Sequence, residues 1–248
     1  MFKIEMEKAK EFKNAIDAIG NIIDEGAFVI NNEGITLHAL DPSQIAMVIF
    51  NMPSHAFSDY NVESTHTVGL NLDSFNKILS RGKDTKLVLT DEKNKLNVQF
   101  SSGSTKKQFK ISLIDTNGGL EREPKVEHDV IIKISAGALK DAIKDISLVS
   151  SHISFDVKKD KLKMSASGDN AEAEIEYSNN DESEVKEMTV KNAARATFPV
   201  QYLDDMLKGA EDSGEVEISI KTNAPVKIKY SVSNANFTYY LAPRIDLE

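Results

Sequence analysis

The second half of this chain repeats the apolar pattern of its first half, and this constrains the fold more than any other feature. Three groups of positions match, two of them at one constant offset and one with a two-residue shift. The pairs are Leu70, Leu72, Phe75, Ile78 and Leu79 with Phe198, Val200, Leu203, Met206 and Leu207; Phe109, Ile111 and Leu113 with Phe237, Tyr239 and Leu241; and Leu96, Val98 and Phe100 with Val226, Ile228 and Tyr230. One match could arise by chance, whereas three indicate an internal duplication.

Hydrophobic periodicity predicts the elements of each half. Alternating apolar residues over 2–6 indicate a strand, and apolar residues at helical spacing over 12–23 and 72–79 indicate two helices. Either Asn71 or Asp73 can cap the second helix. We expect strand, helix, three strands, helix and three strands in each half. Tight turns between strands favour antiparallel pairing, so we predict an α+β fold with two short helices on one face of each half.

The stretch between the halves has no strand alternation and no helical stripe, but it contains a glycine pair, a proline and several charges. We predict an interdomain linker at residues 117–129 between domains at residues 1–116 and 130–248. This linker is either a plain surface loop or a tether that also binds partners. Two further segments are expected to be loops, a polar one after Pro53 and an acidic one over residues 179–187.

Composition and motifs argue against catalysis. The chain has no cysteine, which excludes disulfides, thiolate metal sites and cysteine nucleophiles. Its histidines lack metal-ligand spacing, and it has no glycine-rich phosphate loop and no Gly-x-Ser-x-Gly motif. No run can span a bilayer, and the N-terminus lacks the apolar core of a signal peptide. We expect no enzyme activity, no cofactor, no metal and no membrane partner.

Basic residues gather on the predicted helices, although the net charge of −9 by itself argues against nucleic-acid binding. Cations that share a helix are spaced i, i+3 or i, i+4 and lie off its apolar stripe. Such pairs also occur on ordinary solvated faces. If the helices lie side by side, however, they form a positive surface suited to sequence-independent phosphate contact. The candidate DNA-binding residues are Lys10, Lys13, Lys77, Arg81, Lys140, Lys144 and Lys208.

Four separated motifs resemble the archaeal and eukaryotic DNA sliding clamps, the proliferating cell nuclear antigen (PCNA) family. They are residues 34–43 (GITLHALDPS), 72–79 (LDSFNKIL), 164–169 (MSASGD) and 240–245 (YLAPRI). The resemblance covers the whole chain and implies the DNA-clamp fold, a homotrimeric ring of six domains whose helices line a hole around double-stranded DNA. It implies a DNA polymerase processivity factor that tethers replication and repair enzymes, with the helical cations facing the hole. Gln201 stands where the family often has a basic residue.

The same resemblance implies two protein-binding surfaces. Short peptide motifs of DNA polymerase, the clamp loader replication factor C, flap endonuclease and DNA ligase are expected to bind beside the linker. The residues implied there are Leu40, Gln44, Ile45, Met47, Leu120, Pro124, Ala224, Pro225, Ala242, Pro243 and Ile245. The subunit contact is expected to pair a strand near residues 107–113 with one at 171–177, whose outward faces carry opposite charges. Those charges are Lys107 and Lys110 on one strand and Glu172, Glu174 and Glu176 on the other.

Two alternatives remain from the sequence. The chain could be one subunit of a heterotrimeric clamp, or it could be an enzyme on a duplicated α+β domain, which would need a convergent polar site that the sequence does not reveal. The lack of cysteine and the many charges resemble archaeal rather than eukaryotic members. The expected location is therefore the cytoplasm with the nucleoid in an archaeon, or the nucleus in a eukaryote.

Overall fold

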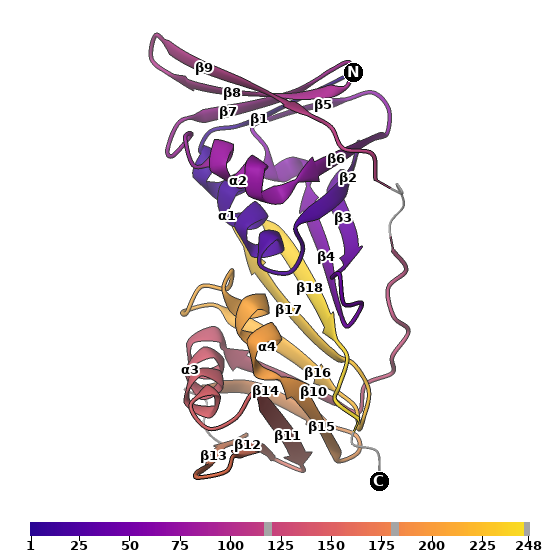
Figure 1. Cartoon of the computed structure of the whole chain (residues 1–248), viewed down its shortest axis with the longest axis vertical. Helices are drawn as coiled ribbons and strands as arrows, with labels where there is room; N and C mark the ends of the chain where they lie inside the picture. The colour runs from indigo at the N-terminus through magenta and orange to yellow at the C-terminus, as the bar shows by residue number, and fades with distance from the viewer. Residues whose placement is uncertain (117–120, 180–183, 246–248) are drawn as a thin grey trace. The chain divides into compact units, whose positions relative to one another are not determined.

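The computed structural model describes residues 1–116, 121–179 and 184–245 (Figure 1). The chain divides into two compact units, each assembled from more than one segment. The first unit comprises Met1–Pro42, Val48–Glu123 and Val232–Phe237, and the second comprises Ser43–Met47, Pro124–Ser231 and Thr238–Glu248.

Within the described residues, each half of the chain contains nine strands and two α-helices in the same order. The first half holds β1 (Phe2–Met6), α1 (Ala9–Gly20), β2 (Glu25–Asn31), β3 (Gly34–Leu40), β4 (Ala46–Pro53), a 3₁₀ turn (Ser54–Ala56), β5 (Asp59–Val62), β6 (His66–Asn71), α2 (Leu72–Leu79), β7 (Lys86–Glu92), β8 (Lys95–Ser102) and β9 (Thr105–Ser112). The second half holds β10 (Val130–Ser135), α3 (Ala136–Ser147), β11 (His152–Lys158), β12 (Lys161–Ser167), β13 (Glu172–Ser178), β14 (Val185–Val190), β15 (Ala194–Pro199), α4 (Val200–Leu207), β16 (Glu215–Ile220), β17 (Val226–Val232) and β18 (Ala235–Leu241).

Strand order confirms the duplication. In the first half the neighbouring strands run β5-β1-β7-β8-β9 and β4-β3-β2-β6, and in the second they run β14-β10-β16-β17-β18 and β13-β12-β11-β15. Each strand of the first half therefore has a counterpart at the same place in the second. The pairing is antiparallel, as in β1–β7 and β10–β16, and the predicted α+β class is confirmed.

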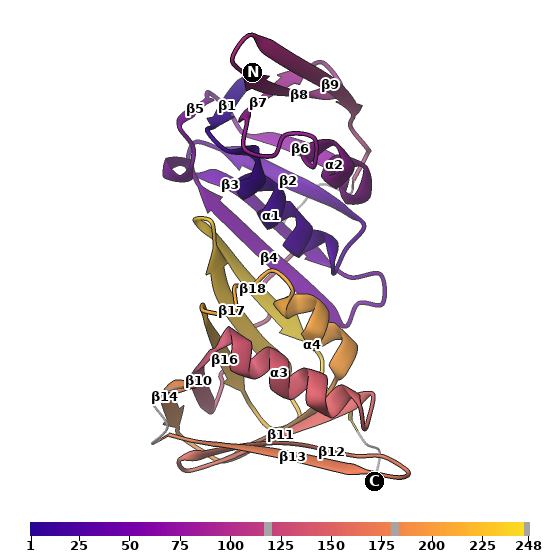
Figure 2. The ribbon, with the colours of Figure 1, turned by 90° about the vertical axis from the view of Figure 1, so that its left-hand side faces the viewer.

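The helices of each unit pack side by side over its strands (Figure 2). Phe12 and Ile16 of α1 are buried, as the helical stripe predicted, and the ring of Phe12 meets that of Phe75 of α2 edge-on at 6.1 Å. Asn71, and not Asp73, caps α2, because its side chain accepts a hydrogen bond from the Ser74 amide at 3.0 Å.

The first backbone amides of α1 and α3 donate hydrogen bonds to backbone carbonyls of the loop that follows the second helix of the same unit, α2 or α4. The four bonds run from Ala9 N to Thr85 O (2.9 Å), Lys10 N to Lys83 O (2.9 Å), Ala136 N to Gly214 O (2.9 Å) and Gly137 N to Asp212 O (3.0 Å). These amides would otherwise lack an intrahelical partner. The same arrangement in both units fixes where α1 and α3 begin.

The predicted plan of three strands between the two helices of each half was wrong, because the structure has five there, β2 to β6 and β11 to β15. Two of the strands outside that plan lie in segments that were predicted to be loops. β5 lies in the polar segment after Pro53, and β14 overlaps the segment predicted to be an acidic loop, of which residues 180–183 lie outside the described residues. Both are edge strands, paired with β1 and β10 on one side only. A strand with one exposed edge needs little apolar alternation, so its sequence does not distinguish it from a loop.

Candidate functional site

The helical cations of the first unit are partly neutralised. Lys13 forms an ion pair with Asp17 on α1, and the Lys77 ammonium lies 2.5 Å from Asp73 on α2. Both pairs have i, i+4 spacing. Such exposed pairs contribute only about 0–1 kcal/mol each, so a phosphate could displace the carboxylate at small cost.

Lys10 and Arg81 are both exposed in the first unit. Lys10 lies in the first turn of α1. Arg81 was expected to share a face of the second helix with Lys77, but α2 ends at Leu79 and Arg81 follows it in a turn. Its amide bonds to the carbonyl of Ile78 at 2.9 Å.

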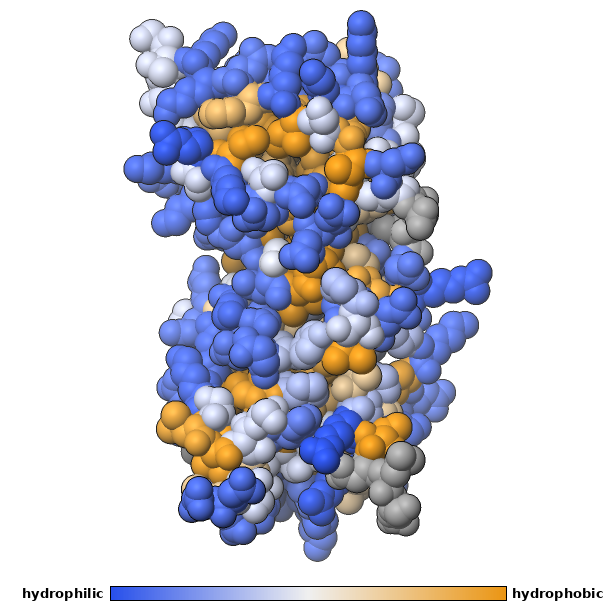
Figure 3. All heavy atoms as spheres, viewed as in Figure 1, coloured by the Kyte–Doolittle hydropathy of each residue, from blue (hydrophilic) through white to orange (hydrophobic). Residues whose placement is uncertain are grey.

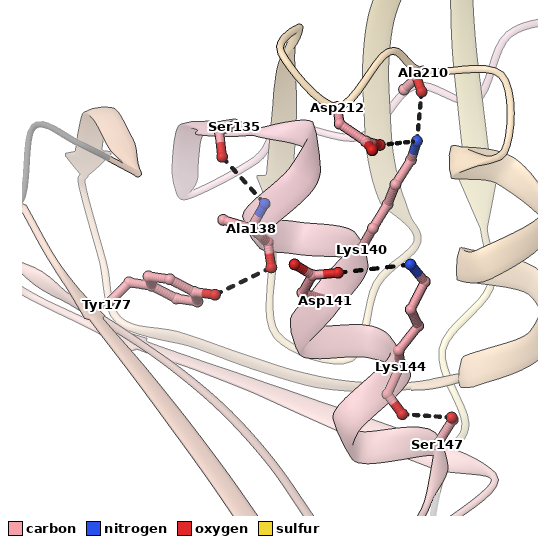
Figure 4. A network of polar contacts seen from close by, with 9 residues as sticks. All are labelled: Ser135, Ala138, Lys140, Asp141, Lys144, Ser147, Tyr177, Ala210 and Asp212. Carbon is pink, nitrogen blue, oxygen red and sulfur yellow. Dashed lines mark hydrogen bonds and ion pairs between the residues drawn. The ribbon is translucent and has the colours of Figure 1, made fainter.

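Lys140 of the second unit differs from the other candidates because its ammonium is enclosed. Its side chain is only 15% exposed, and Nζ donates to the Ala210 carbonyl at 2.5 Å and to Asp212 Oδ1 at 2.8 Å (Figure 4). The pKa of Asp212 is lowered chiefly by this hydrogen bond. Lys140 therefore joins α3 to the loop that follows α4 and presents little charge to an external phosphate.

Lys144 and Lys208 remain accessible. The side chain of Lys144 is 65% exposed, and its ammonium lies 3.6 Å from Asp141 (Figure 4). Lys208 follows the last residue of α4, and its ammonium lies 2.5 Å from Asp205, which also accepts from the Gln201 amide at 3.1 Å. Five of the seven candidate cations, namely Lys13, Lys77, Lys140, Lys144 and Lys208, therefore lie beside a carboxylate of their own unit.

The two strands predicted to join subunits are both edge strands, β9 beside β8 and β13 beside β12. However, Lys107 and Lys110 do not share a face of β9. Lys107 pairs with Phe100 and lies on the inward face with Phe109, whereas Lys110 pairs with Asn97 and lies on the other face. The prediction of one shared face was wrong because these positions differ by an odd number of residues.

Lys106 is the residue that shares the outward face with Lys110, since the two are separated by an even number of residues along β9. It is exposed, as is Gln108 between them. Alternation along the strand could have identified Lys106 from the sequence. The prediction instead chose Lys107 and Lys110, whose odd separation puts them on opposite faces of a strand.

The glutamates of β13 do share one exposed face, but each already has a partner. The Glu174 carboxylate lies 2.5 Å from the Lys163 ammonium, and that of Glu176 lies 2.7 Å from Lys161. Glu172 accepts from the Ser167 hydroxyl at 3.2 Å. On β9 of the first unit, Lys110 forms an ion pair with Glu92 at 2.7 Å. Any charge complementarity between edges would therefore add to pairs that exist within one chain.

Two residues of the predicted peptide site, Ile45 and Ala242, meet in the second unit. The Ala242 amide donates to the Ile45 carbonyl at 2.8 Å, and the Arg244 amide donates to the Thr197 carbonyl at 2.8 Å. The chain after β18 is therefore fixed along its backbone at two points. Ile245 at its end is 64% exposed, which leaves a large apolar side chain available for contact.

The other members of the set differ in accessibility. Gln44 is exposed with a left-handed φ of 59° in the turn before β4, while Met47 is 3% exposed and can only support the surface from below. Pro124, Ala224 and Pro225 are half-buried in the second unit.

Leu40 belongs to the first unit, where it is 42% exposed at the end of β3. Pro243 is half-buried in the second unit, and Leu120 lies outside the described residues. Figure 3 shows one face of the molecule, on which hydrophilic side chains predominate and apolar side chains show between them.

The described residues add two findings on other site types. They contain no group of three or more His, Asp or Glu side chains placed to hold a metal ion. Across residues 1–116, 121–179 and 184–245, no helix is long and apolar enough to cross a membrane.

The duplicated α+β units, each with a helix pair and an exposed edge strand, define a class of two-domain clamp proteins, and comparison with known proteins identifies the family. Residues 1–118 match the protein family described as "Proliferating cell nuclear antigen, N-terminal domain", and residues 122–245 match the family of the corresponding C-terminal domain. The chain belongs to the PCNA family.

Individual relatives match along their whole length. A protein of Thermococcus gammatolerans named DNA polymerase sliding clamp is 37% identical over 249 residues, which cover 99% of each chain. The crystal structure of PCNA from Thermococcus kodakaraensis is similar with a TM-score of 0.92 at 33% identity, covering 98% of this chain and 100% of that one. A structure of A. fulgidus PCNA bound to the C-terminal region of FEN-1 has a TM-score of 0.89 at 28% identity and covers both chains fully.

Proposed function

We propose that this protein is a DNA sliding clamp, a closed homotrimeric ring that encircles duplex DNA and has no catalytic activity of its own. The observation that supports this most strongly is the end-to-end similarity to proteins named DNA polymerase sliding clamp, at 37% identity over 99% of the chain. The ring would be a processivity factor that holds replication and repair enzymes on DNA. Its place in the cell would be with the DNA, in the nucleoid if the source is archaeal.

In this function the helix pairs face DNA phosphates without reading sequence. We assign the contacts to the predicted cations, with Lys10, Arg81 and Lys144 as the strongest because they are exposed. Lys13, Lys77 and Lys208 would exchange a carboxylate partner for phosphate. Lys140 would act through the position of α3 instead of through its own charge.

Ring closure would join β9 of one subunit to β13 of the next. Two open sheet edges are a liability for aggregation in a single chain, and mutual pairing removes both. The exposed glutamates of β13 and the outward lysines of β9 give the two edges opposite charge. The apolar inward residues of the same strands, such as Phe109 and Ile175, would add contact area.

Partner enzymes would bind through short peptides beside the linker at residues 117–129. The complex of A. fulgidus PCNA with the C-terminal region of FEN-1 supports this reading by similarity. Here the exposed side chains of Leu40 and Ile245 supply apolar contact. Peptides with aromatic and aliphatic anchors suit such a surface. DNA polymerase, replication factor C, flap endonuclease and DNA ligase are the proposed partners.

A heterotrimeric clamp built from this chain and two others is the remaining alternative within the family. Light scattering of the purified chain separates the two, because a homotrimer gives three times the mass of the 27.4 kDa chain without any added protein. A purified chain that stays monomeric at micromolar concentration would reject the homotrimer. Loss of DNA retention by the assembled ring would reject the clamp itself.

A further inference from the structure

Each end of the linker that the structure describes is bonded by a histidine ring. In the first unit, His38 Nδ1 lies 2.9 Å from the backbone carbonyl oxygen of Glu121. In the second unit, His128 Nε2 lies 3.1 Å from the carbonyl oxygen of Pro225. The first histidine projects from β3 onto the linker, and the second projects from the linker onto the loop before β17.

The chemistry of these bonds assigns the protons. A carbonyl oxygen can only accept, so each ring nitrogen must donate, which places a hydrogen on His38 Nδ1 and on His128 Nε2. Both distances are in the normal range for such a bond. His38 donates from Nδ1 and His128 from Nε2, which is farther from the backbone. The amide nitrogen of the shorter Asn can therefore replace His38 Nδ1, and that of the longer Gln can replace His128 Nε2.

The backbone next to the second bond is also held. The Asp129 amide donates to the Ile220 carbonyl at 3.1 Å, and the Asn192 side-chain amide donates to Asp129 Oδ1 at 2.8 Å. At the other side of the linker, the Ile114 amide bonds to the Gly69 carbonyl at 3.0 Å. A Cβ on Gly69 would lie 2.3 Å from the Ile114 carbonyl oxygen, so only glycine admits this approach.

Between the two histidine bonds, the charged side chains of the linker are exposed. Arg122, Glu123, Lys125 and Glu127 are all exposed, whereas Pro124 and Val126 are half-buried. Because each end of this segment is bonded to its own unit, the residues beside each bond have fewer conformations available. We call residues 121–128 with their two histidine bonds the clasped strap.

Each bond is built on an element that also carries a predicted peptide-binding residue. His38 lies on the same face of β3 as Leu40, two residues along the strand. His128 bonds directly to the carbonyl of Pro225, itself one of the predicted residues. The two bonds therefore act on the part of each unit where a partner peptide is proposed to bind.

We propose that His38 and His128 are positioning residues that hold the strap in the conformation a partner peptide meets. This rests on the proposed peptide-binding function. A strap already fixed at both ends loses less conformational entropy on binding, so peptides bind more tightly than to a loose linker. Neither histidine needs to touch the peptide.

Trypsin tests the strap itself, independently of any partner, because Arg122 and Lys125 are exposed cleavage sites within it. In the full chain, His38→Ala or His128→Ala should raise the initial rate of cleavage at these two residues about fivefold, the change expected when one hydrogen bond that opposes local opening is lost. His38→Asn and His128→Gln keep a donor at the same reach and should restore the parent rate. His55→Ala, at an exposed histidine in the 3₁₀ turn, is the matched control and should leave the rate unchanged.

Calorimetry tests the consequence with a synthetic peptide of the C-terminal region of A. fulgidus FEN-1. The two alanine variants should bind it about three- to fivefold more weakly than the parent, and the two amide variants should bind like the parent. Thermal unfolding of each variant should match the parent within a few degrees, which shows that the fold is kept.

Each outcome decides one claim. Unchanged tryptic cleavage in both alanine variants would overturn the clasped strap. Faster cleavage with unchanged peptide affinity would overturn the positioning role. If the parent itself fails to bind the peptide, the proposed partner function is wrong, while the cleavage rates still decide whether the histidines hold the strap.

Discussion

At the scale of single residues, Lys140 and Lys144 have different roles although both lie on α3. Lys140 makes two hydrogen bonds to the loop after α4, whereas Lys144 is open to solvent. We predict that Lys140→Ala lowers the free energy of unfolding by about 1–2 kcal/mol, because it removes charged hydrogen bonds and exposes α3 at its contact with the loop. Urea unfolding measures this.

Lys144→Ala is the matched control for that prediction and should change the unfolding free energy by less than about 0.5 kcal/mol. In DNA binding the order should be reversed, with the larger effect in Lys144→Ala. Only this variant should reduce the salt dependence of retention on DNA, by about one phosphate contact. Equal unfolding midpoints for the two variants would mean that the Lys140 contacts contribute nothing to stability.

His128 gives the fold a dependence on pH. Burial is the largest cause that lowers the pKa of His128 below its ordinary 6.5. The unfolded chain therefore takes up the proton at higher pH than the folded chain, and stability is complete above about pH 6.5 and falls as the pH drops through the window below it. We predict that His128→Gln removes this part of the decline, measured as urea midpoints at pH 7.5 and 5.5.

His55→Gln serves as the comparison, since His55 is an exposed histidine. It should follow the parent at both pH values. A parent whose midpoint is the same at both values, or a His128→Gln variant that declines as steeply as the parent, would contradict the assignment.

At the scale of elements, the N-terminus of α2 tests which side chain caps the helix, Asn71 or Asp73. The Asn71 side chain accepts a hydrogen bond from the Ser74 amide. Asn71→Ala should cost about 1 kcal/mol, and Asp73→Ala should cost less, because Asp73 only pairs with an exposed lysine. Denaturant unfolding of the two variants compares them directly, and a larger loss in Asp73→Ala would reverse the assignment.

The sequence predicted most elements because their apolar periodicity is strong, but it placed β5 and β14 in segments expected to be loops. Both are edge strands whose pairing partners, β1 and β10, are distant in sequence. Edge position removes the need for alternating burial, and local patterns then carry no strand signal. By contrast, the opposite facing of Lys107 and Lys110 follows from strand parity alone and could have been predicted.

The candidate sites divide in the same way. The pairing of Lys13 with Asp17 was open to prediction, because i, i+4 spacing on a helix brings the two together. The enclosure of Lys140 was not, because Asp212 and Ala210 come from a loop far along the chain. The hydrogen bonds from His38 to Glu121 and from His128 to Pro225 could not be predicted either, because no sequence motif indicates them.

At the scale of the whole molecule, ring closure should depend on the charge of the β13 face. A charge swap of Lys163→Glu with Glu174→Lys keeps the ion pair within the chain while reversing the sign at the edge strand. We predict that the swap preserves the fold and shifts the proposed trimer toward monomer in light scattering at low salt. High salt should reduce the difference, because these charges are exposed. A swapped protein with unchanged trimer affinity would place the subunit contact elsewhere.

The central claim is that the protein surrounds DNA, and topology tests it most directly. The protein is loaded by replication factor C onto a nicked circular plasmid, freed from unbound protein by gel filtration, and followed before and after one restriction cut. A clamp stays on the circle even at a salt concentration that breaks phosphate contacts, and it slides off once the DNA has ends. Retention that is equal on circular and linear DNA, or that salt abolishes on the circle, would contradict the account.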